Sequence, residues 1–223
     1  LNTLITEPEI SLIDQSLSSR MAVHATNGDG FGVGWYGRNN EPGVYRSIYP
    51  AWNDENFKQI GHHIEAPIFL AHIRRATGTP VQSSNCHPFQ FAHWLFVHNG
   101  LIRDFSKIHR ELLLQVSPKY FNHMRGSTDS EIIFCLALTF GLENDPCDAL
   151  EKTIGLIEKV GKAQGTEFPF QGTFGFSNGD TLYAVRYSSE GESRSLYYSE
   201  AIDTLKKLLP EGPRFDMFDH TSR

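Results

Sequence analysis

The chain has 223 residues, with 20 lysines and arginines against 26 aspartates and glutamates, which gives a formal net charge of −6. This length is sufficient to bury a sizeable core, and a hydrophobic content of 39% is typical of globular proteins. The acidic balance, without a basic run, argues against a nucleic-acid binder, and no stretch is apolar for long enough to span a membrane. Three scattered cysteines favour neither a disulfide framework nor a zinc site, and they indicate a reducing, cytoplasmic setting.

A single domain is expected over residues 1–223, because no repeat, linker-like run or low-complexity segment divides them. The first residue is Leu1 and no signal peptide follows it, so we expect the native start to lie upstream. The last residues, 219–223, do not complete a recognisable element either.

The first hundred residues are predicted to hold several short strands. Residues 31–36 alternate glycine with larger side chains, so the glycine side of this strand would allow another backbone or a ligand to approach closely. Further strands are expected over 44–48, 68–73 and 94–98, and residues 53–64 have the apolar spacing of a helix.

Helices are predicted to dominate the next part of the chain. They are expected over 104–116, 128–140 and 146–162, where apolar residues recur at helical spacing. Their succession without intervening strands differs from the strict alternation of a doubly wound sheet.

Strands return after these helices. They are predicted over 171–176 and 181–187, joined through Asn178-Gly179, a step typical of hairpin turns. A strand over 195–198 and a helix over 201–209 are expected to follow. The order of strands, helices and strands indicates an α+β fold in which helices pack on antiparallel sheets.

Two sequence features resemble sites that their context does not support. Gly32, Gly34 and Gly37 have the spacing of a dinucleotide-binding fingerprint, but they lie in a predicted strand and no helix follows them. Six histidines lie between positions 62 and 98, without the helical spacing or the cysteines of a zinc site. We therefore expect surface or hydrogen-bonded core histidines, and no metal.

The cysteines are interpreted as structural. Cys86 precedes His87, but consecutive side chains diverge in an extended chain, so this pair is not expected to exchange a proton. Cys135 falls on the apolar stripe of a predicted helix, and Cys147 lies near the start of another.

Three separate segments carry side chains that suit an amino-acid ligand. Arg74 or Arg75, at the end of a predicted strand, would clamp a carboxylate, with the Thr77 hydroxyl as a further donor. Neighbours in a strand point to opposite faces, so spacing alone does not decide between the two arginines. Two surface charges are the alternative.

Asn99-Gly100 follows a predicted strand and has two interpretations. It is either a tight turn, or a pair of donors that converge on one oxygen and form an oxyanion hole. Thr128 and Glu131 form a capping box, which places Asp129 in the first helical turn. A carboxylate there is favoured by the helix dipole and would also receive the ammonium group of a ligand.

Taken together, these segments resemble the class II glutamine amidotransferases, which are N-terminal-nucleophile hydrolases. The segments are Ala71-His72-Ile73-Arg74-Arg75-Ala76-Thr77, Val97-His98-Asn99-Gly100 and Ser127-Thr128-Asp129-Ser130-Glu131. The glycine-rich residues 27–35 are similar to the early strand of the stand-alone bacterial members. The resemblance spans essentially the whole chain.

The resemblance implies a four-layer αββα sandwich of two antiparallel sheets and an enzyme that needs no cofactor. An N-terminal cysteine would attack the side-chain amide of glutamine, with its own α-amino group as the base. The Asn99 side chain and the Gly100 N–H would hold the oxyanion. Arg74 and Thr77 would bind the α-carboxylate of glutamine, and Asp129 its α-amino group. Ammonia would leave, and water would hydrolyse the thioester.

The chain also departs from the family pattern. No cysteine stands at position 1, so we expect a first strand with its nucleophile to be missing ahead of residues 4–17. Gly78 stands where some relatives carry a histidine that contacts the carboxylate. No synthase domain fits in the chain, so either a separate subunit accepts the ammonia or the protein simply hydrolyses its substrate. A γ-glutamyl amide hydrolase of the ergothioneine-pathway type and a non-catalytic glutamine-binding module are the alternatives.

Overall fold

The protein is described by a computed structural model that covers residues 11–18, 26–37, 39–76, 78–192 and 196. Its strands form two antiparallel sheets. The first sheet has the order β2-β1-β3, and the second has the order β4-β5-β6-β7. The strands are β1 (Phe31–Tyr36), β2 (Pro42–Ser47), β3 (Phe69–Ile73), β4 (Phe89–Phe91), β5 (Trp94–Ile102), β6 (Phe170–Ser177) and β7 (Leu182–Ser188).

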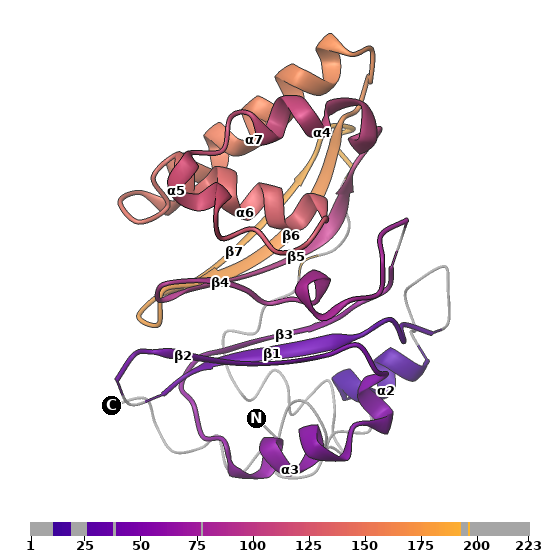
Figure 1. Ribbon diagram of the computed structural model, residues 1–223, viewed down its shortest axis with the longest axis vertical. Helices are drawn as coiled ribbons and strands as arrows, with labels where there is room; N and C mark the ends of the chain where they lie inside the picture. Colours follow the sequence, from indigo (N-terminus) through magenta and orange to yellow (C-terminus); the bar gives the residue numbers. More distant parts are fainter. Residues whose placement is uncertain (1–10, 19–25, 38, 77, 193–195, 197–223) are drawn as a thin grey trace.

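Helices cover the outer face of each sheet, so the described residues form four layers (Figure 1). Beside the first sheet lie α2 (Leu12–Leu17) and α3 (Glu55–His63). Beside the second sheet lie α4 (Phe105–Leu113), α5 (Pro118–Phe121), α6 (Asp129–Thr139) and α7 (Pro146–Ala163). The predicted α+β class and the αββα sandwich are therefore confirmed. No helix among the described residues has the length and apolar character that crossing a membrane requires.

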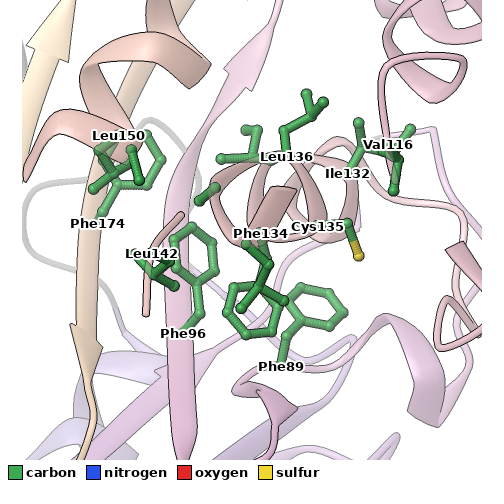
Figure 2. Close-up of a cluster of buried hydrophobic side chains, with 14 of the residues drawn as sticks. Phe89, Phe96, Val116, Ile132, Phe134, Cys135, Leu136, Leu142, Leu150 and Phe174 are labelled. Carbon is green, nitrogen blue, oxygen red and sulfur yellow. The ribbon is translucent and has the colours of Figure 1, made fainter. Parts of the chain in front are cut away.

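The main core lies between the second sheet and its helices. Phe96 of β5 stacks on Phe134 of α6 with ring centroids 5.1 Å apart, and Phe174 of β6 joins them (Figure 2). Every residue of α6 from Ser130 to Leu138 is buried, so this helix has neighbours on all sides. Burial of this kind stabilises by roughly 1.5–3 kcal/mol for each large apolar side chain. The N-terminus of α6 is fixed in place as a result.

The two sheets meet through a smaller apolar cluster of Tyr36, Leu70 and Leu95. A Cβ atom at Gly34 would lie 2.8 Å from Leu95 of the other sheet, and one at Gly32 would overlap the carbonyl oxygen of His87. The predicted close approach on the glycine side of residues 31–36 is thus confirmed, and the approaching groups are a side chain and the backbone of this same chain.

Most of the predicted elements are present, with ends shifted by a few residues. The hairpin turn at Asn178-Gly179 is confirmed, with Gly179 at a φ of 94°. The short elements α2, α5 and β4 were not predicted. The strand and helix expected after residue 194 fall outside the residues that the structure describes.

The structure excludes one of the two interpretations of Asn99-Gly100. Asn99-Gly100 is not a turn, because β5 continues through it to Ile102. The reason is pairing: Asn99 lies opposite Thr173 of β6, and Gly100 lies opposite Gly172. A partner strand seventy residues away supplies the hydrogen bonds that keep this pair extended.

Candidate active site

Asp129 is fixed against the end of the strand that carries Asn99 and Gly100. Its Oδ2 atom accepts the backbone N–H of Ile102 at 3.0 Å, and its Oδ1 atom accepts that of Ser130 at 2.9 Å. Because Ile102 follows Asn99 by three residues in β5, the carboxylate lies at the same end of the sheet as the Asn-Gly pair. Sequence reasoning had placed these residues in separate segments, and the structure brings them together.

The expected capping box at this helix is only half formed. The Thr128 side chain accepts the N–H of Glu131 at 3.2 Å, as an N-cap does. Glu131, however, accepts the N–H groups of Arg125 and Gly126, both at 2.8 Å, instead of that of Thr128. The segment ahead of the helix folds back over Glu131 and offers it two backbone N–H donors, whereas a capping box would offer only the N–H of Thr128. The buried carboxylate therefore holds the chain that leads into Asp129.

Asn99 lies on the side of β5 that faces the first sheet. Leu95 and Val97 pack in the cluster between the sheets, and alternation along the strand gives Asn99 the same direction. Unlike them it is exposed. Gly100 is exposed as well, but it has no room for a side chain, because a Cβ there would overlap the carbonyl oxygen of Gln171 and lie 2.6 Å from the His98 ring.

Arg74 approaches from the opposite sheet. It follows β3 directly and shares the direction of Leu70, whose side chain packs between the sheets. It is only 4% exposed, whereas Arg75 is exposed. Of the two arginines, Arg74 therefore faces the interior. Thr77 falls outside the described residues.

Hydrogen bonds hold the Arg74 guanidinium in place. Nη1 donates to the carbonyl oxygen of Asp29 at 3.1 Å, and Nη2 donates to Thr79 Oγ1 at 2.8 Å and to the Pro80 carbonyl at 3.2 Å. Among the described residues, these bonds use three of the five donors of a guanidinium, and the other two would serve a carboxylate. Asp29 also accepts the N–H of Ala76 at 2.9 Å, so the loop after Arg74 is tied on both sides. The sequence marked Asp29 only as part of a glycine-rich segment.

Three of the six histidines, His72, His87 and His98, lie close to one another; His87 and His98 are buried, and His72 is half-buried. The rings of His72 and His87 lie 4.1 Å apart, and His72 is hydrogen-bonded to the backbone of His98. Burial lowers the pKa of His72 and of His98 to about 4, and it holds that of His87 well below its usual value. All three are neutral at pH 7. Positive charges beside them depress these pKa values further: that of Arg74 acts on His72 and His87, and that of Arg46 acts on His87.

The described part of the chain contains no group of three or more histidine, cysteine or acidic side chains arranged to hold a metal ion. The cysteines are structural as predicted in two cases. Burial raises the pKa of the Cys86 thiol, and it raises that of Cys135 to about 12. Cys147 is exposed at the start of α7.

A cleft of about 310 Å³ lies elsewhere, between β4, α5 and α6. Its lining includes Phe91, Tyr120 and Glu131, but none of the residues predicted to bind glutamine. Support for the predicted site therefore comes from the position of its polar groups, which lie at the end of β5 and after the end of β3.

Comparison with known proteins agrees with the fold and with the predicted family. The profile described as "Glutamine amidotransferases class-II" matches residues 3–198. The chain belongs to this family. A solved structure, a glutamine aminotransferase class-II domain protein from Silicibacter pomeroyi, is 40% identical with a TM-score of 0.70, and the match covers 78% of this chain and 76% of that one.

Two curated relatives carry more specific names. "Probable glutamine amidotransferase DUG3" of Saccharomyces cerevisiae is 33% identical over 89% of this chain. "Gamma-glutamyl-hercynylcysteine sulfoxide hydrolase" of Mycobacterium tuberculosis is 35% identical over 46% of it. The chain spans 64% of the yeast protein's length and 44% of the mycobacterial protein's length.

Proposed function

We propose that this protein hydrolyses the side-chain amide of glutamine, or the γ-glutamyl amide of a related compound, at the edge between its two sheets. The observation that carries the proposal is the pairing of a fixed carboxylate, Asp129, with the strand end that holds Asn99. The buried guanidinium of Arg74 supports the proposal too, because Arg74 follows β3 on the side of the first sheet that packs against the second. A guanidinium and a carboxylate are the complement of the two charges on an α-amino acid.

The residues divide the work between binding and chemistry. Arg74, assisted by Thr77, takes the α-carboxylate of the substrate, and Asp129 takes its α-ammonium group. The γ-carbonyl then lies at Asn99 and Gly100, whose side-chain amide and backbone N–H stabilise the oxyanion. Such a donor is typically worth about 100- to 1000-fold in rate.

In the proposed reaction the nucleophile is an N-terminal cysteine, as the resemblance to the class II amidotransferases implies. Its thiolate bonds to the γ-carbon, the oxyanion collapses, and the carbon–nitrogen bond breaks as the leaving amine takes the proton removed from the thiol. Water then displaces the thiolate from the thioester and releases glutamate. Burial raises the pKa values of Cys86 and Cys135, which makes both of them poor nucleophiles.

The test is an assay of the complete gene product from its native start codon. We expect glutamate and ammonia in equal amounts from glutamine, and loss of both after alkylation of the N-terminal thiol. A folded protein that binds glutamate but releases nothing would favour the non-catalytic binding module. A folded protein that binds neither glutamine nor glutamate would overturn the proposal.

A larger γ-glutamyl substrate is the second candidate, favoured by the mycobacterial relative named as a hydrolase of such a compound. Both reactions need the same glutamyl site and differ only in the leaving amine. Glutamine and a series of γ-glutamyl amides of increasing size, compared by kcat/KM, separate the two. Preference for glutamine together with stimulation by a co-purified synthase subunit would support ammonia transfer to a partner.

A further inference from the structure

We infer that Asn85 is the positioning residue that sets the distance between the carboxylate-binding and the amine-binding halves of the site. The inference rests on the proposed function, because it assigns those two halves to Arg74 and Asp129. Asn85 lies at the end of a single 3₁₀ turn, Ser83–Asn85, and it is 0% exposed. Asn85 belongs to no strand. Its side chain bonds to Pro80, in the loop after Arg74, and to Ser127, in the segment that leads into α6.

One arm of Asn85 reaches the segment that holds Arg74. Its Nδ2 atom donates to the carbonyl oxygen of Pro80 at 2.9 Å. The same oxygen accepts Nη2 of Arg74 at 3.2 Å. Asn85 and Arg74 therefore share one acceptor, and a displacement of Pro80 moves both partners.

The other arm reaches the segment that leads into α6. The Oδ1 atom of Asn85 accepts the backbone N–H of Ser127 at 2.9 Å, and Nδ2 lies 3.4 Å from Ser127 Oγ. Ser127 precedes the N-cap Thr128, and Asp129 is the first residue of the helix. A bond to Ser127 thus acts two residues away from the carboxylate that we assign to the substrate's ammonium group.

The packing around Asn85 leaves it no alternative position. A Cβ atom at Gly126 would overlap its Oδ1 atom and would lie 2.8 Å from the carbonyl oxygen of Ser84. Glu131 holds Gly126 from the other side through the N–H bond described above. Only a glycine at 126 allows the amide of Asn85 to enter between the two segments.

An amide is the side chain that this place requires. The Pro80 carbonyl needs a donor, and the Ser127 N–H needs an acceptor, so one group must offer both. A series of hydrogen bonds therefore links the two halves of the site outside the apolar core. It runs from Arg74 through Pro80 and Asn85 to Ser127, two residues before Asp129. A ligand with a carboxylate and an ammonium on one carbon tolerates little error in their separation, and a misplacement of about 1 Å typically costs on the order of 100-fold in rate.

The test measures glutamate binding by titration calorimetry, with the complete protein and its Asn85→Ala and Asn85→Asp variants. Asn85→Ala removes both arms. Asn85→Asp keeps the volume and the acceptor for Ser127, but it sets a carboxylate oxygen against the Pro80 carbonyl and a negative charge beside Arg74. We expect each variant to bind glutamate about 10- to 100-fold more weakly. In the hydrolysis assay, KM for glutamine rises more than kcat falls, because the oxyanion donors on β5 are untouched.

Thr153→Ala provides the matched control. Thr153 is also 0% exposed and donates to the Ala149 carbonyl at 2.8 Å, but both residues lie within α7. We expect it to lower the melting temperature without changing glutamate affinity. If Asn85→Ala does not fold, Asn85→Asp decides. Wild-type affinity in a folded Asn85→Asp variant would overturn the inference and leave the proposed function standing. Absence of glutamate binding in the unsubstituted protein would overturn both.

Discussion

The hydroxyl of Tyr36 in the first sheet donates to the carbonyl oxygen of Ser177 in the second sheet, 2.6 Å away. The same hydroxyl lies 2.9 Å from the carbonyl oxygen of His93. Tyr36 is 1% exposed, and its burial raises its pKa to about 12. This polar contact sits within the apolar cluster between the sheets, and it gives the sandwich a fixed register between its layers.

Removal of that hydroxyl is expected to destabilise the protein. Tyr36→Phe leaves the buried carbonyl oxygen of Ser177 without this donor, which typically costs about 1–3 kcal/mol in the free energy of unfolding. Urea denaturation monitored by circular dichroism measures the change. Tyr49→Phe is the control, because Tyr49 is 67% exposed and surface substitutions usually stay within about 0.5 kcal/mol. Equal stability of the two variants would contradict the structural role of the Tyr36 hydroxyl.

The two arginines after β3 allow a paired test of carboxylate binding. Arg74→Lys keeps the charge but loses the planar fork, and we expect affinity for glutamate to fall about 10- to 100-fold. Arg75→Lys is the matched control and should change affinity little, because that side chain is exposed. Titration calorimetry of both variants decides, and the reverse ranking would show that Arg75 faces the ligand.

Substitution of Asp129 separates its charge from its structural hydrogen bond. Asp129→Asn retains an oxygen that can accept the Ile102 N–H, but it no longer attracts an ammonium group. We expect KM for glutamine to rise at least about tenfold, with a smaller loss of thermal stability. Asp148→Asn, in the first turn of α7, controls for loss of a carboxylate at a helix N-terminus. An unchanged KM in Asp129→Asn would remove Asp129 from the site.

The buried histidines make stability depend on pH in a defined window. Their pKa values are lowered in the folded state, so below about pH 6.5 the unfolded chain binds more protons than the native one. Stability is therefore unaffected above this pH and falls as the pH drops from about 6.5 towards 4. Each histidine contributes a slope of up to about 1.4 kcal/mol per pH unit.

Urea denaturation at several pH values measures this slope. His72→Gln removes one of the titrating groups and should flatten the profile by up to that amount. His62→Gln is the control, since His62 is exposed on α3. A profile of the unsubstituted protein that stays flat between pH 6.5 and 4 would show that the cluster accepts protons in the native state without cost.

Thiol chemistry gives a direct test of the cysteine assignment. In the native protein we expect iodoacetamide to label Cys147 and to spare Cys86 and Cys135, because both are buried and their pKa values are raised. In urea all three should react. Peptide mass spectrometry locates the label, and rapid native labelling of Cys86 would reopen its interpretation as a nucleophile.

Local signals were sufficient for the sequence to predict most of the fold. The helix over 146–162, the hairpin at Asn178-Gly179 and the N-cap Thr128 each depend on residues within one or two turns of one another. The course of β5 through Asn99 does not, because its partner Thr173 is remote in the sequence. Strand ends set by distant pairing are not visible in a local pattern.

The candidate site shows the same division. The types and order of Arg74, Asn99 and Asp129 were enough to name them, but their grouping depends on the packing of two sheets. Asn85 carried no signal at all, because an asparagine in a short polar turn is common in any loop. Its bonds to Pro80 and Ser127 become visible only once both layers are in place.

Because α6 is buried on all sides, Asp129 at its start is harder to move in evolution than Arg74 in the other half of the candidate site. A helix surrounded by packed neighbours cannot rotate or slide without rearranging the core between the second sheet and its helices. The position of Asp129 at the start of α6 is therefore fixed. Arg74 is held instead by loop residues, Asp29, Thr79 and Pro80, so substitutions in these loops can change its position without moving a helix. Diversification of ligand preference among similar proteins should therefore accumulate on the arginine side, and engineering of new specificity is best begun there.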